Sequence, residues 1–398
     1  MTQSLLNPLV SQAAAVARES LAANLRTIRE AAGDRTVLVA GANQYGSVWT
    51  RDFCFASGGL LASGERQPVE DTLEQIAAHQ RPDGLYPRLL DSYSPITRFI
   101  RAGLGSRIPL RAPLRPNFIS DHLVLAYDSN ALVVDAACRA ARGNRAFGER
   151  LLPSMERALA WCRARMLGGF IFQPPFSDWK DTIAARRGAV FFTQLQYWKA
   201  LGSLAELCDA LGKGAAAQAL REEAARFDDK VQSAFWDESG GFLRDTLELP
   251  LLSTDGNLAA VAWGFVPREK ALRILAAIES KKLWTPWGPR AGERYPYGEK
   301  GWFARLALVH GYQDDFVWLW ISALALRALH AAGQAARRDA LLETLCERIA
   351  RERKISEVYR PEDGREVRTW LYRSEAPFSW SSGMLLEAFA ELGALPER

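Results

Sequence analysis

Histidine is scarce in this sequence, and its scarcity argues against two classes of chemistry. The 398 residues contain four histidines, none at ligand spacing from another, so the sequence predicts no metal site. Without a G-x-S-x-G motif, and with so few histidines, a Ser-His-Asp triad is not expected either. No G-x-x-x-x-G-K-[ST] motif occurs, nor any G-x-G-x-x-G after a strand. We therefore expect neither nucleotide-phosphate binding nor a cofactor.

Cysteines and long apolar runs are also few. The five cysteines stand singly, without C-x-x-C spacing, which is typical of buried thiols in a reducing compartment. No run of about 18 apolar residues is present, so we expect no membrane span. The first 20 residues lack the basic start and apolar run of a secretory signal. These features together predict a cytoplasmic protein.

The charge of the chain gives no sign of a nucleic-acid partner. The net charge is +4, and residues of both signs are mixed along the sequence. The most basic segment, Arg98–Arg115, is interpreted as a solvated loop rather than a binding strip. The sequence leaves the oligomeric state open, and a homo-oligomer is one possibility.

Helical periodicity recurs from end to end, with few alternating strands. No Pro- or Ser-rich linker divides the chain, so we expect a single domain over residues 1–398. The fold class predicted is all-α, an (α/α)6 toroid barrel of about twelve helices whose long loops form one cleft. A helical solenoid is the alternative, but it requires a regular repeat with short loops. The predicted helices span residues 9–31, 54–63, 68–80, 127–142, 149–166, 190–211, 214–235, 256–263, 267–278, 314–332, 334–351 and 379–391.

Tryptophan and charged residues gather in three long loops. The chain has 13 tryptophans, which either fill the core or line a sugar-binding cleft, where indole stacks on pyranose C–H faces. The loops lie at about 167–188, 281–314 and 354–380. Such loops on a rigid helical frame are where function usually resides.

Carboxylates are the remaining candidates for chemistry. The segment "FSDWKDTI" places Asp178 and Asp181 on either side of Trp179. One interpretation is a helix N-cap, and the other is a general acid whose pKa is raised by aromatic neighbours. Glu357 in "SEVYRPEDG", with Glu375 in "RSEAPFSWSSG" as its rival, can serve as a general base. Two carboxylates on different loops of one cleft suffice for glycoside hydrolysis.

The stretch "NQYGSVWTRDFCFASGGLL" (residues 43–61) raises a separate question. It places Arg51 and Asp52 behind Trp49, at the start of an apolar helix. Charged groups at such a buried position are costly unless they bind a ligand or each other. The pair therefore either grips vicinal hydroxyls of a sugar or forms an internal ion pair that fixes the helix start.

Several motifs, in matching order from about Gly46 to Phe389, resemble the (α/α)6-barrel glycoside hydrolases. This group includes alkaline/neutral invertases, trehalases, processing α-glucosidases and the glucosidase part of glycogen-debranching enzymes. The similar segments are "VWTRDF", "YDSNALVVDAACRAA", "SDWKDTIAARRGAVFFTQLQYWKAL", "STDGNLAAVAWGFV", "GYQDDFVWLW" and "EVYRPEDG…FSWSSGMLLEAF". The match is not complete, since "GYQDDFVWLW" lacks the Gly and Pro of the invertase segment. These departures concern the substrate more than the reaction.

The resemblance implies an inverting glycoside hydrolase, with Asp181 as general acid, Asp178 as second choice, and Glu357 as general base. It further implies that a set of cleft residues binds the sugar. In this interpretation the substrate is a small α-glucoside or oligosaccharide, cleaved from its end. The alternatives are a sugar epimerase or lyase on the same barrel, or an inactive carbohydrate-binding toroid. The expected sugar-binding residues are Trp49, Arg51, Asp52, Asp128, Trp179, Gln194, Trp318, Glu375 and Trp380.

Overall fold

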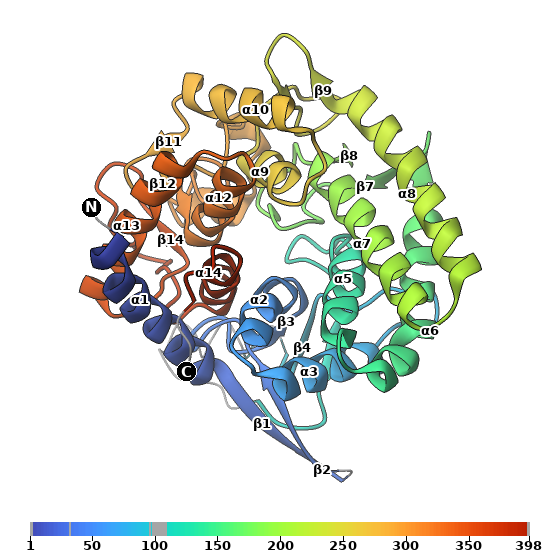
Figure 1. The fold of residues 1–398 in the computed structure, drawn as a ribbon. Helices are drawn as coiled ribbons and strands as arrows, with labels where there is room; N and C mark the ends of the chain where they lie inside the picture. Colours follow the sequence, from blue (N-terminus) through green and yellow to red (C-terminus); the bar gives the residue numbers. More distant parts are fainter. Residues whose placement is uncertain (1–2, 32, 95–96, 98–109, 396–398) are drawn as a thin grey trace.

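The computed structural model describes residues 3–31, 33–94, 97 and 110–395. Within these ranges six inner helices form a closed ring, in which each helix packs against the next and the last packs against the first (Figure 1). This arrangement is the predicted (α/α)6 toroid. The inner helices are α2 (Thr50–Ala62), α5 (Ser129–Ala141), α7 (Phe191–Ala210), α9 (Thr254–Ala262), α12 (Leu319–Ala331) and α14 (Ser379–Glu391).

Six further helices surround this ring. The outer helices differ from the inner ones in their apolar pattern: α12 is buried continuously from Leu319 to Leu326, whereas α8 buries a stripe that includes Phe227, Val231 and Phe235. A helix that is apolar all round is stable only when other helices enclose it, and a striped helix covers a core on one side. The outer helices are α1 (Gln3–Asn24), α3 (Arg66–Ala78), α6 (Arg145–Arg163), α8 (Gly214–Phe235), α10 (Arg268–Ser280) and α13 (Ala335–Glu352).

The predicted helix over residues 9–31 is wrong at its C-terminal end. Helix α1 ends at Asn24, and the chain continues as an antiparallel hairpin of β1 (Leu25–Glu30) and β2 (Gly33–Leu38). Ile28 and Val37 are both fully buried, and β2 packs against α3, which favours a strand where the sequence alone suggested a helix. The predicted helix over 314–332 is wrong at its N-terminal end. The observed helix begins at Leu319, because the two residues before it form a strand.

Short antiparallel strands stand at the N-terminal ends of several inner helices. β3 (Val48–Trp49) precedes α2 and pairs with β4 (Leu89–Asp91), which pairs with β5 (Arg115–Asn117). β8 (Gly188–Ala189) precedes α7 and is the third strand of a sheet with β6 (Met166–Leu167) and β7 (Phe170–Gln173). The long loops therefore converge on this end of the ring.

A strand pair also sits in front of α12. β13 (Val317–Trp318) pairs with β14 (Val358–Tyr359), and this register places Glu357 beside the first residues of α12. The remaining short elements are the pairs β9 (Trp236–Asp237) with β10 (Phe242–Leu243) and β11 (Trp284–Thr285) with β12 (Gly288–Pro289), the helix α11 (Trp302–Leu306) and a 3-10 turn at Tyr297–Glu299.

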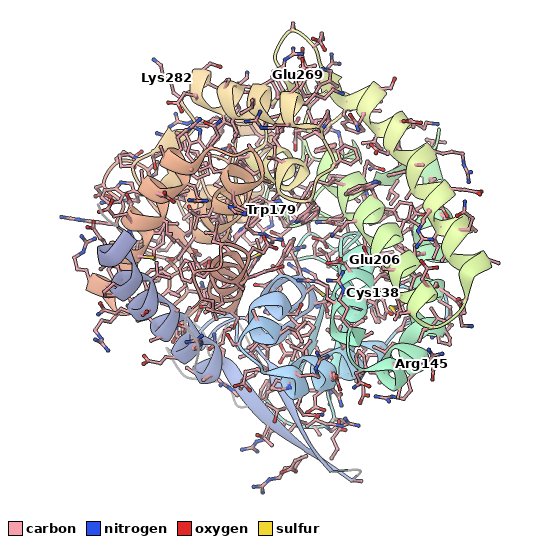
Figure 2. The ribbon with its side chains drawn as sticks, viewed as in Figure 1. Cys138, Arg145, Trp179, Glu206, Glu269 and Lys282 are labelled. Atoms are coloured by element: carbon pink, nitrogen blue, oxygen red, sulfur yellow. The ribbon has the colours of Figure 1, made fainter. Side chains whose placement is uncertain are left out.

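An aromatic cluster fills the middle of the ring. Trp380 stacks on Phe55 and on Trp320, with ring centroids 4.8 and 4.5 Å apart. Trp179 packs edge-on against Trp320 at 5.0 Å and lies near the centre of the ring (Figure 2). The cluster divides the interior of the ring into two halves, one at each end of the inner helices.

The described residues also bear on several smaller expectations. The five cysteines are all buried and free of disulfides, as predicted. No helix in the described ranges is long and apolar enough to cross a membrane. Residues 98–109 of the Arg-rich segment lie outside the described residues.

Candidate active site

A cavity opens at the loop end of the ring, next to the N-termini of the inner helices. We call it the loop cavity. It brings together residues that are more than 300 positions apart in the sequence. Its lining consists of Tyr45, Trp49, Arg51, Asp52, Arg88, Asp121, Trp179, Asp181, Thr182, Val309, Tyr312, Gln313, Trp318, Glu357, Tyr372, Phe378 and Trp380. Both predicted carboxylates, Asp181 and Glu357, are therefore in one cavity.

The Asp181 side chain lines the loop cavity, and its carboxylate accepts hydrogen bonds from one cationic and one neutral side chain. Arg88 donates to Oδ2 at 2.9 Å, and the Gln313 amide donates to Oδ1 at 3.0 Å. Arg51 lies further away, with a guanidinium nitrogen 3.9 Å from Oδ2. The Asp181 side chain is 20% exposed, so it remains accessible to a ligand in the cavity.

A buried ion-pair network fixes the residues just before Asp181. Two guanidinium nitrogens of Arg186 lie 2.7 and 2.8 Å from Asp178 Oδ2, and Asp178 Oδ1 accepts a hydrogen bond from the Lys180 backbone. Arg186 pairs in addition with Asp245 at 2.8 Å. Asp178 is 1% exposed and does not line the loop cavity, so its carboxylate is committed to structure. This placement corrects the second-choice assignment of Asp178 as the acid.

Trp179 and Lys180 are anchored in the same way. The Trp179 indole donates to Asp255, and the Lys180 ammonium donates to Ser253 at 2.6 Å and to the Ala291 carbonyl at 3.0 Å. Three consecutive side chains are thus tied to buried partners, and the next one, Asp181, projects into the cavity. The Asp178–Asp181 segment is not a helix N-cap, because α7 begins only at Phe191.

Glu357 is 2% exposed and surrounded by hydrogen-bond donors. The hydroxyls of Tyr312 and Tyr372 donate to its two carboxylate oxygens, the second at 2.7 Å, and the Glu375 backbone donates at 3.2 Å. Burial raises the pKa of Glu357 to about 8, although the hydrogen bonds from the two tyrosines and from the Glu375 backbone act to lower it. A small change in this environment therefore changes the protonation state near neutral pH.

Arg51 and Asp52 both line the loop cavity, but Arg51 has its ion pair elsewhere. Its guanidinium contacts both oxygens of Asp128, the residue directly before α5, in a buried pair. Asp128 is 1% exposed and lies outside the lining, so its expected contact with substrate is not supported by its position. Burial raises the pKa of Asp52 to about 7, although the charge of Arg51 lowers it.

The other expected sugar-binding residues divide into two groups. Trp49, Trp179, Trp318 and Trp380 line the loop cavity. Gln194 does not, because its amide pairs with both backbone groups of Ile171 at 2.9 Å and so holds β7 against α7. Glu375 is also outside the lining: it accepts hydrogen bonds from the backbones of Asn43 and Gln44, at 2.8 and 3.0 Å. Both are satisfied structural groups.

Several lining residues were not predicted. Arg88 lies in "GLYPRLLD", a segment without any recognisable motif, and its guanidinium stacks over Trp49 at 4.7 Å while it pairs with Asp181. The tyrosines Tyr45, Tyr312 and Tyr372 stand within quoted segments or long loops, and their shared position around Glu357 depends on the fold. The only feature of the sequence that could have indicated these tyrosines is the presence of aromatic residues near the loops that carry the two carboxylates.

No group of three or more His, Cys, Asp and Glu side chains in the described part of the chain is arranged to hold a metal ion. The chemistry available in the loop cavity is that of carboxyl, phenol and guanidinium groups. Two carboxyl groups of different environment, facing one cavity walled by tryptophan, are the equipment of acid–base glycoside hydrolysis.

Solved structures of glycosidases share this fold. A GH63 mannosylglycerate hydrolase from Thermus thermophilus, in complex with Tris, superposes with a TM-score of 0.66 at 14% identity, covering 94% of this chain and 99% of that one. A glycosidase variant in complex with glucose gives 0.70 at 17% identity, with full coverage of both chains. A rhamnosidase from Klebsiella oxytoca with rhamnose bound gives 0.68 at 14% identity, covering 97% of this chain and 64% of that one. No curated protein matches the sequence.

The fold is an (α/α)6 barrel, and the family model identifies the chain as a glycoside hydrolase. The chain belongs to the family of the mannosylglycerate hydrolase MGH1-like glycoside hydrolase domain, whose model matches residues 178–381. The matched span includes both Asp181 and Glu357. Membership in a glycoside hydrolase family favours hydrolysis over the epimerase, lyase and inactive-toroid alternatives.

Proposed function

We propose that this enzyme hydrolyses a small α-glycoside with inversion, using Asp181 as general acid and Glu357 as general base. The observation that carries this proposal is the convergence of the two carboxyl groups, from loops about 175 residues apart, on one cavity. Trp49, Trp318 and Trp380 supply apolar walls for a sugar ring, and Arg51 and Asp52 supply polar groups for its hydroxyls.

In the proposed reaction Asp181 gives its proton to the glycosidic oxygen as the bond between this oxygen and the anomeric carbon breaks. A water molecule attacks the anomeric carbon from the opposite face, and Glu357 accepts the proton that the water loses. The products are an alcohol and a sugar of inverted anomeric configuration. An inverting mechanism requires about 6.5–9.5 Å between the two carboxyl groups, compared with about 5–5.5 Å in retaining enzymes.

The hydrogen bonds around Glu357 suit a general base. Three donors converge on its carboxylate, and such donors stabilise the ionised form that a base needs. Gln313 and Arg88 orient Asp181 from the side, which leaves its position in the cavity well defined.

A second assignment exchanges the two roles. The raised pKa of Glu357 favours a protonated carboxyl group at neutral pH, as an acid requires, and Asp181, which pairs with Arg88, then takes the role of the base. The exchanged roles predict inversion as well. The two assignments can be distinguished with a substrate whose leaving group needs no proton, because only the variant that lacks the base then loses activity.

The position of the cavity and the similar proteins support a proposal for the substrate class. A cavity enclosed by long loops at one end of a ring favours a short substrate cleaved from its end. We propose a small α-glucoside or the corresponding α-mannoside, because the fold is similar to a mannosylglycerate hydrolase and to a glycosidase that binds glucose. The aglycone is proposed to be small.

The test is hydrolysis of a panel of α- and β-linked glucosides and mannosides, including mannosylglycerate, with proton NMR of the fresh anomer. We expect a β-anomer released from an α-linked substrate. Release of the α-anomer would contradict inversion, and no hydrolysis of any member would contradict the proposed substrate class.

A glycosyl fluoride separates the two roles, because fluoride leaves without a proton. With Asp181 as acid, Asp181→Asn retains activity on the fluoride and loses it on the natural linkage, while Glu357→Gln loses both. The reverse pattern would establish the exchanged assignment.

A further inference from the structure

Two consecutive residues, Tyr312 and Gln313, contact the two candidate catalytic carboxyl groups. The Tyr312 hydroxyl donates to Glu357 Oε1, and the Gln313 amide donates to Asp181 Oδ1 at 3.0 Å. Both residues line the loop cavity. Asp181 and Glu357 come from separate loops, so this dipeptide links two groups that lie far apart in the sequence.

Both polar atoms of the Gln313 amide are hydrogen-bonded to the segment that carries Asp181. Its Nε2 also donates to the Trp179 carbonyl, and its Oε1 accepts from the backbone and the hydroxyl of Thr182, at 2.8 and 2.6 Å. The Trp179 carbonyl can only accept and the Thr182 backbone N–H can only donate, so these partners fix which end of the amide faces Asp181. Gln313 is 3% exposed, and water therefore competes little for these hydrogen bonds.

The turn that carries the dipeptide is itself held in place. The Trp318 indole donates to the Tyr312 carbonyl. The next residue after the dipeptide, Asp314, is fully buried, where it forms an ion pair with Lys300 and accepts a hydrogen bond from the Tyr295 backbone at 2.9 Å. The dipeptide is thus part of a fixed turn, and its two side chains hold their partners at a defined separation.

We propose that Tyr312 and Gln313 form a spacer that sets the distance between the two carboxyl groups, with Gln313 as the positioning residue of Asp181. This inference rests on the proposed function. Inversion requires about 6.5–9.5 Å between the two groups, because the attacking water has to fit between them and the sugar. Nε2 of Gln313 can only donate, so Oδ1 of Asp181 acts as the acceptor, which favours Oδ2 as the oxygen that carries the transferred proton.

Gln313→Met tests the spacer, because methionine keeps the length of the side chain and removes the amide. We expect kcat on an α-glycoside to fall about 10–100-fold, as the acid loses its fixed position, while activity on the glycosyl fluoride is retained. Tyr312→Phe removes a donor to Glu357, so it should follow Glu357→Gln and lose activity on both substrates. If the two catalytic roles are exchanged, these patterns exchange as well, because each spacer residue acts through its own carboxyl group.

The comparison with Asp181→Asn decides the outcome. A Gln313→Met variant that keeps full activity on the glycoside would overturn the proposal. So would losses on the two substrates that do not follow the pattern of Asp181→Asn, since general damage to the fold lowers both activities alike. A native enzyme that hydrolyses neither substrate would overturn the proposed function and this inference with it, whereas an active native enzyme with an unaffected Gln313→Met overturns this inference alone.

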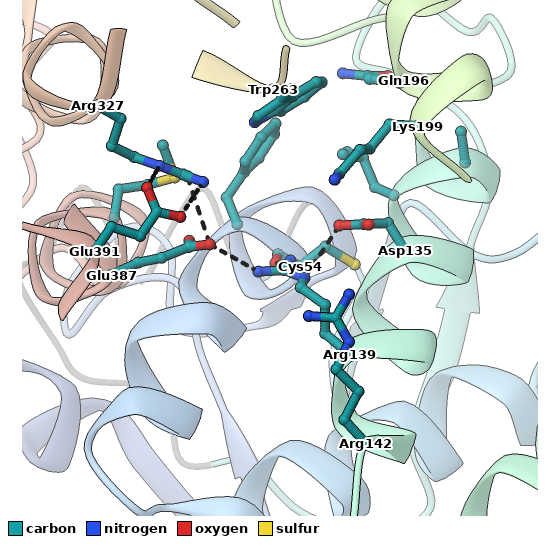
Figure 3. A pocket seen from close by; sticks show the side chains of 14 residues that line it. Cys54, Asp135, Arg139, Arg142, Gln196, Lys199, Trp263, Arg327, Glu387 and Glu391 are labelled. Carbon is teal, nitrogen blue, oxygen red and sulfur yellow. Dashed lines mark hydrogen bonds and ion pairs between the residues drawn. The ribbon is translucent and has the colours of Figure 1, made fainter. Parts of the chain in front are cut away.

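The matched control is Gln196→Met in a second cavity, toward the C-terminal ends of the inner helices (Figure 3). Gln196 is also 3% exposed, and it lines this cavity together with Lys199 and Trp263. The same substitution at an equally buried glutamine, away from the two catalytic carboxyl groups, is expected to leave both activities unchanged. An equal loss of glycoside activity in this control would overturn the assignment of Gln313 as a positioning residue. Circular dichroism confirms that each variant is folded.

Gln313→Glu isolates the donor to Asp181 in a second way. The new carboxyl group keeps an acceptor for Thr182, but it can donate to Asp181 only when it is protonated. The activity of this variant relative to the native enzyme should therefore increase as the pH falls. A ratio that stays constant with pH would overturn the proposal that the Gln313 donor positions Asp181.

Discussion

Arg51 at the start of α2 forms a buried ion pair with Asp128 at the start of α5, not with its sequence neighbour Asp52. The guanidinium contacts both Asp128 oxygens, and its remaining nitrogen lies 3.9 Å from Asp181. The pair joins two neighbouring inner helices and orients Arg51 toward the loop cavity. Asp52 faces the cavity beside Arg51. The Arg-Asp pair of the sequence is therefore not an ion pair: Arg51 pairs with Asp128, and Asp52 lines the cavity.

Removing Asp128 should destabilise the protein strongly. In Asp128→Ala the guanidinium of Arg51 stays buried without its partner, and we expect a loss of about 3–5 kcal/mol in the free energy of unfolding. Urea unfolding followed by circular dichroism measures the change. The control is Glu206→Ala, which breaks an exposed ion pair with Arg142 and should cost about 0–1 kcal/mol. Equal losses in the two variants would contradict a structural role for the buried pair.

Asp181 and Asp178 should respond oppositely to the same substitution. Asp181→Asn removes the proposed acid and is expected to lower kcat by about 10²–10⁴-fold, with a smaller fall in Tm than Asp178→Asn because the Asp181 side chain is 20% exposed. Asp178→Asn weakens the buried pair with Arg186 and is expected to lower Tm while kcat falls far less. Steady-state kinetics and thermal unfolding of both variants decide the matter. A larger loss of kcat in Asp178→Asn would reverse the assignment.

The Tm of Glu357→Gln should rise relative to that of the native enzyme as the pH rises. Burial raises the pKa of Glu357 to about 8 in the folded state, above its value in the unfolded chain. The group therefore contributes most to stability at low pH, and this contribution is lost as the pH rises through about 8. Glutamine does not ionise, so the difference in Tm between variant and native enzyme should increase from about pH 5 to about pH 8.5. A constant difference over this range would show that Glu357 has an ordinary pKa.

The pH dependence of kcat/KM should report the protonation of Glu357 in the free enzyme. If Glu357 is the base, kcat/KM falls as the pH drops below about 8, because the protonated group accepts no proton. Tyr372→Phe removes a donor that stabilises the ionised form, and it should move this limb to higher pH. Asp52 also titrates near neutral pH, so the limb is measured again in Asp52→Asn, where it should persist. A limb that disappears in Asp52→Asn would assign it to Asp52 instead.

Much of the fold could be predicted because most of its helices are recognisable from local apolar periodicity. The expected helix over 214–235 agrees with α8, and that over 379–391 agrees with α14. About twelve such helices, joined by long loops and not divided by a linker, led to the predicted barrel. The hairpin of β1 and β2 was missed because β2 packs against α3, and the sequence of the hairpin does not reveal this contact.

The candidate site was harder to predict than the fold. Asp181 and Glu357 were identified as the candidate acid and base by the resemblance of their loops to those of (α/α)6-barrel glycoside hydrolases. The structure separates Asp178 from Asp181 through Arg186, which neutralises Asp178 within a buried network that Arg186 also forms with Asp245 and Asp255. Arg88 carried no signal at all. Gln194 and Glu375 looked like ligand-binding groups, yet their hydrogen-bonding capacity is used by nearby backbone.

The sequence by itself determined the helical class, the loops that carry the polar and aromatic residues, and the two carboxylates proposed for catalysis. The first two depend on side-chain periodicity and residue type, which are local properties of the chain, and the choice of the two carboxylates also rests on the resemblance to (α/α)6-barrel glycoside hydrolases. Only the tertiary structure decided which charged groups are neutralised by buried partners and which face the cavity. That outcome depends on burial and on contacts between residues far apart in the sequence, such as Arg51 with Asp128, and the ring has to close before those contacts exist.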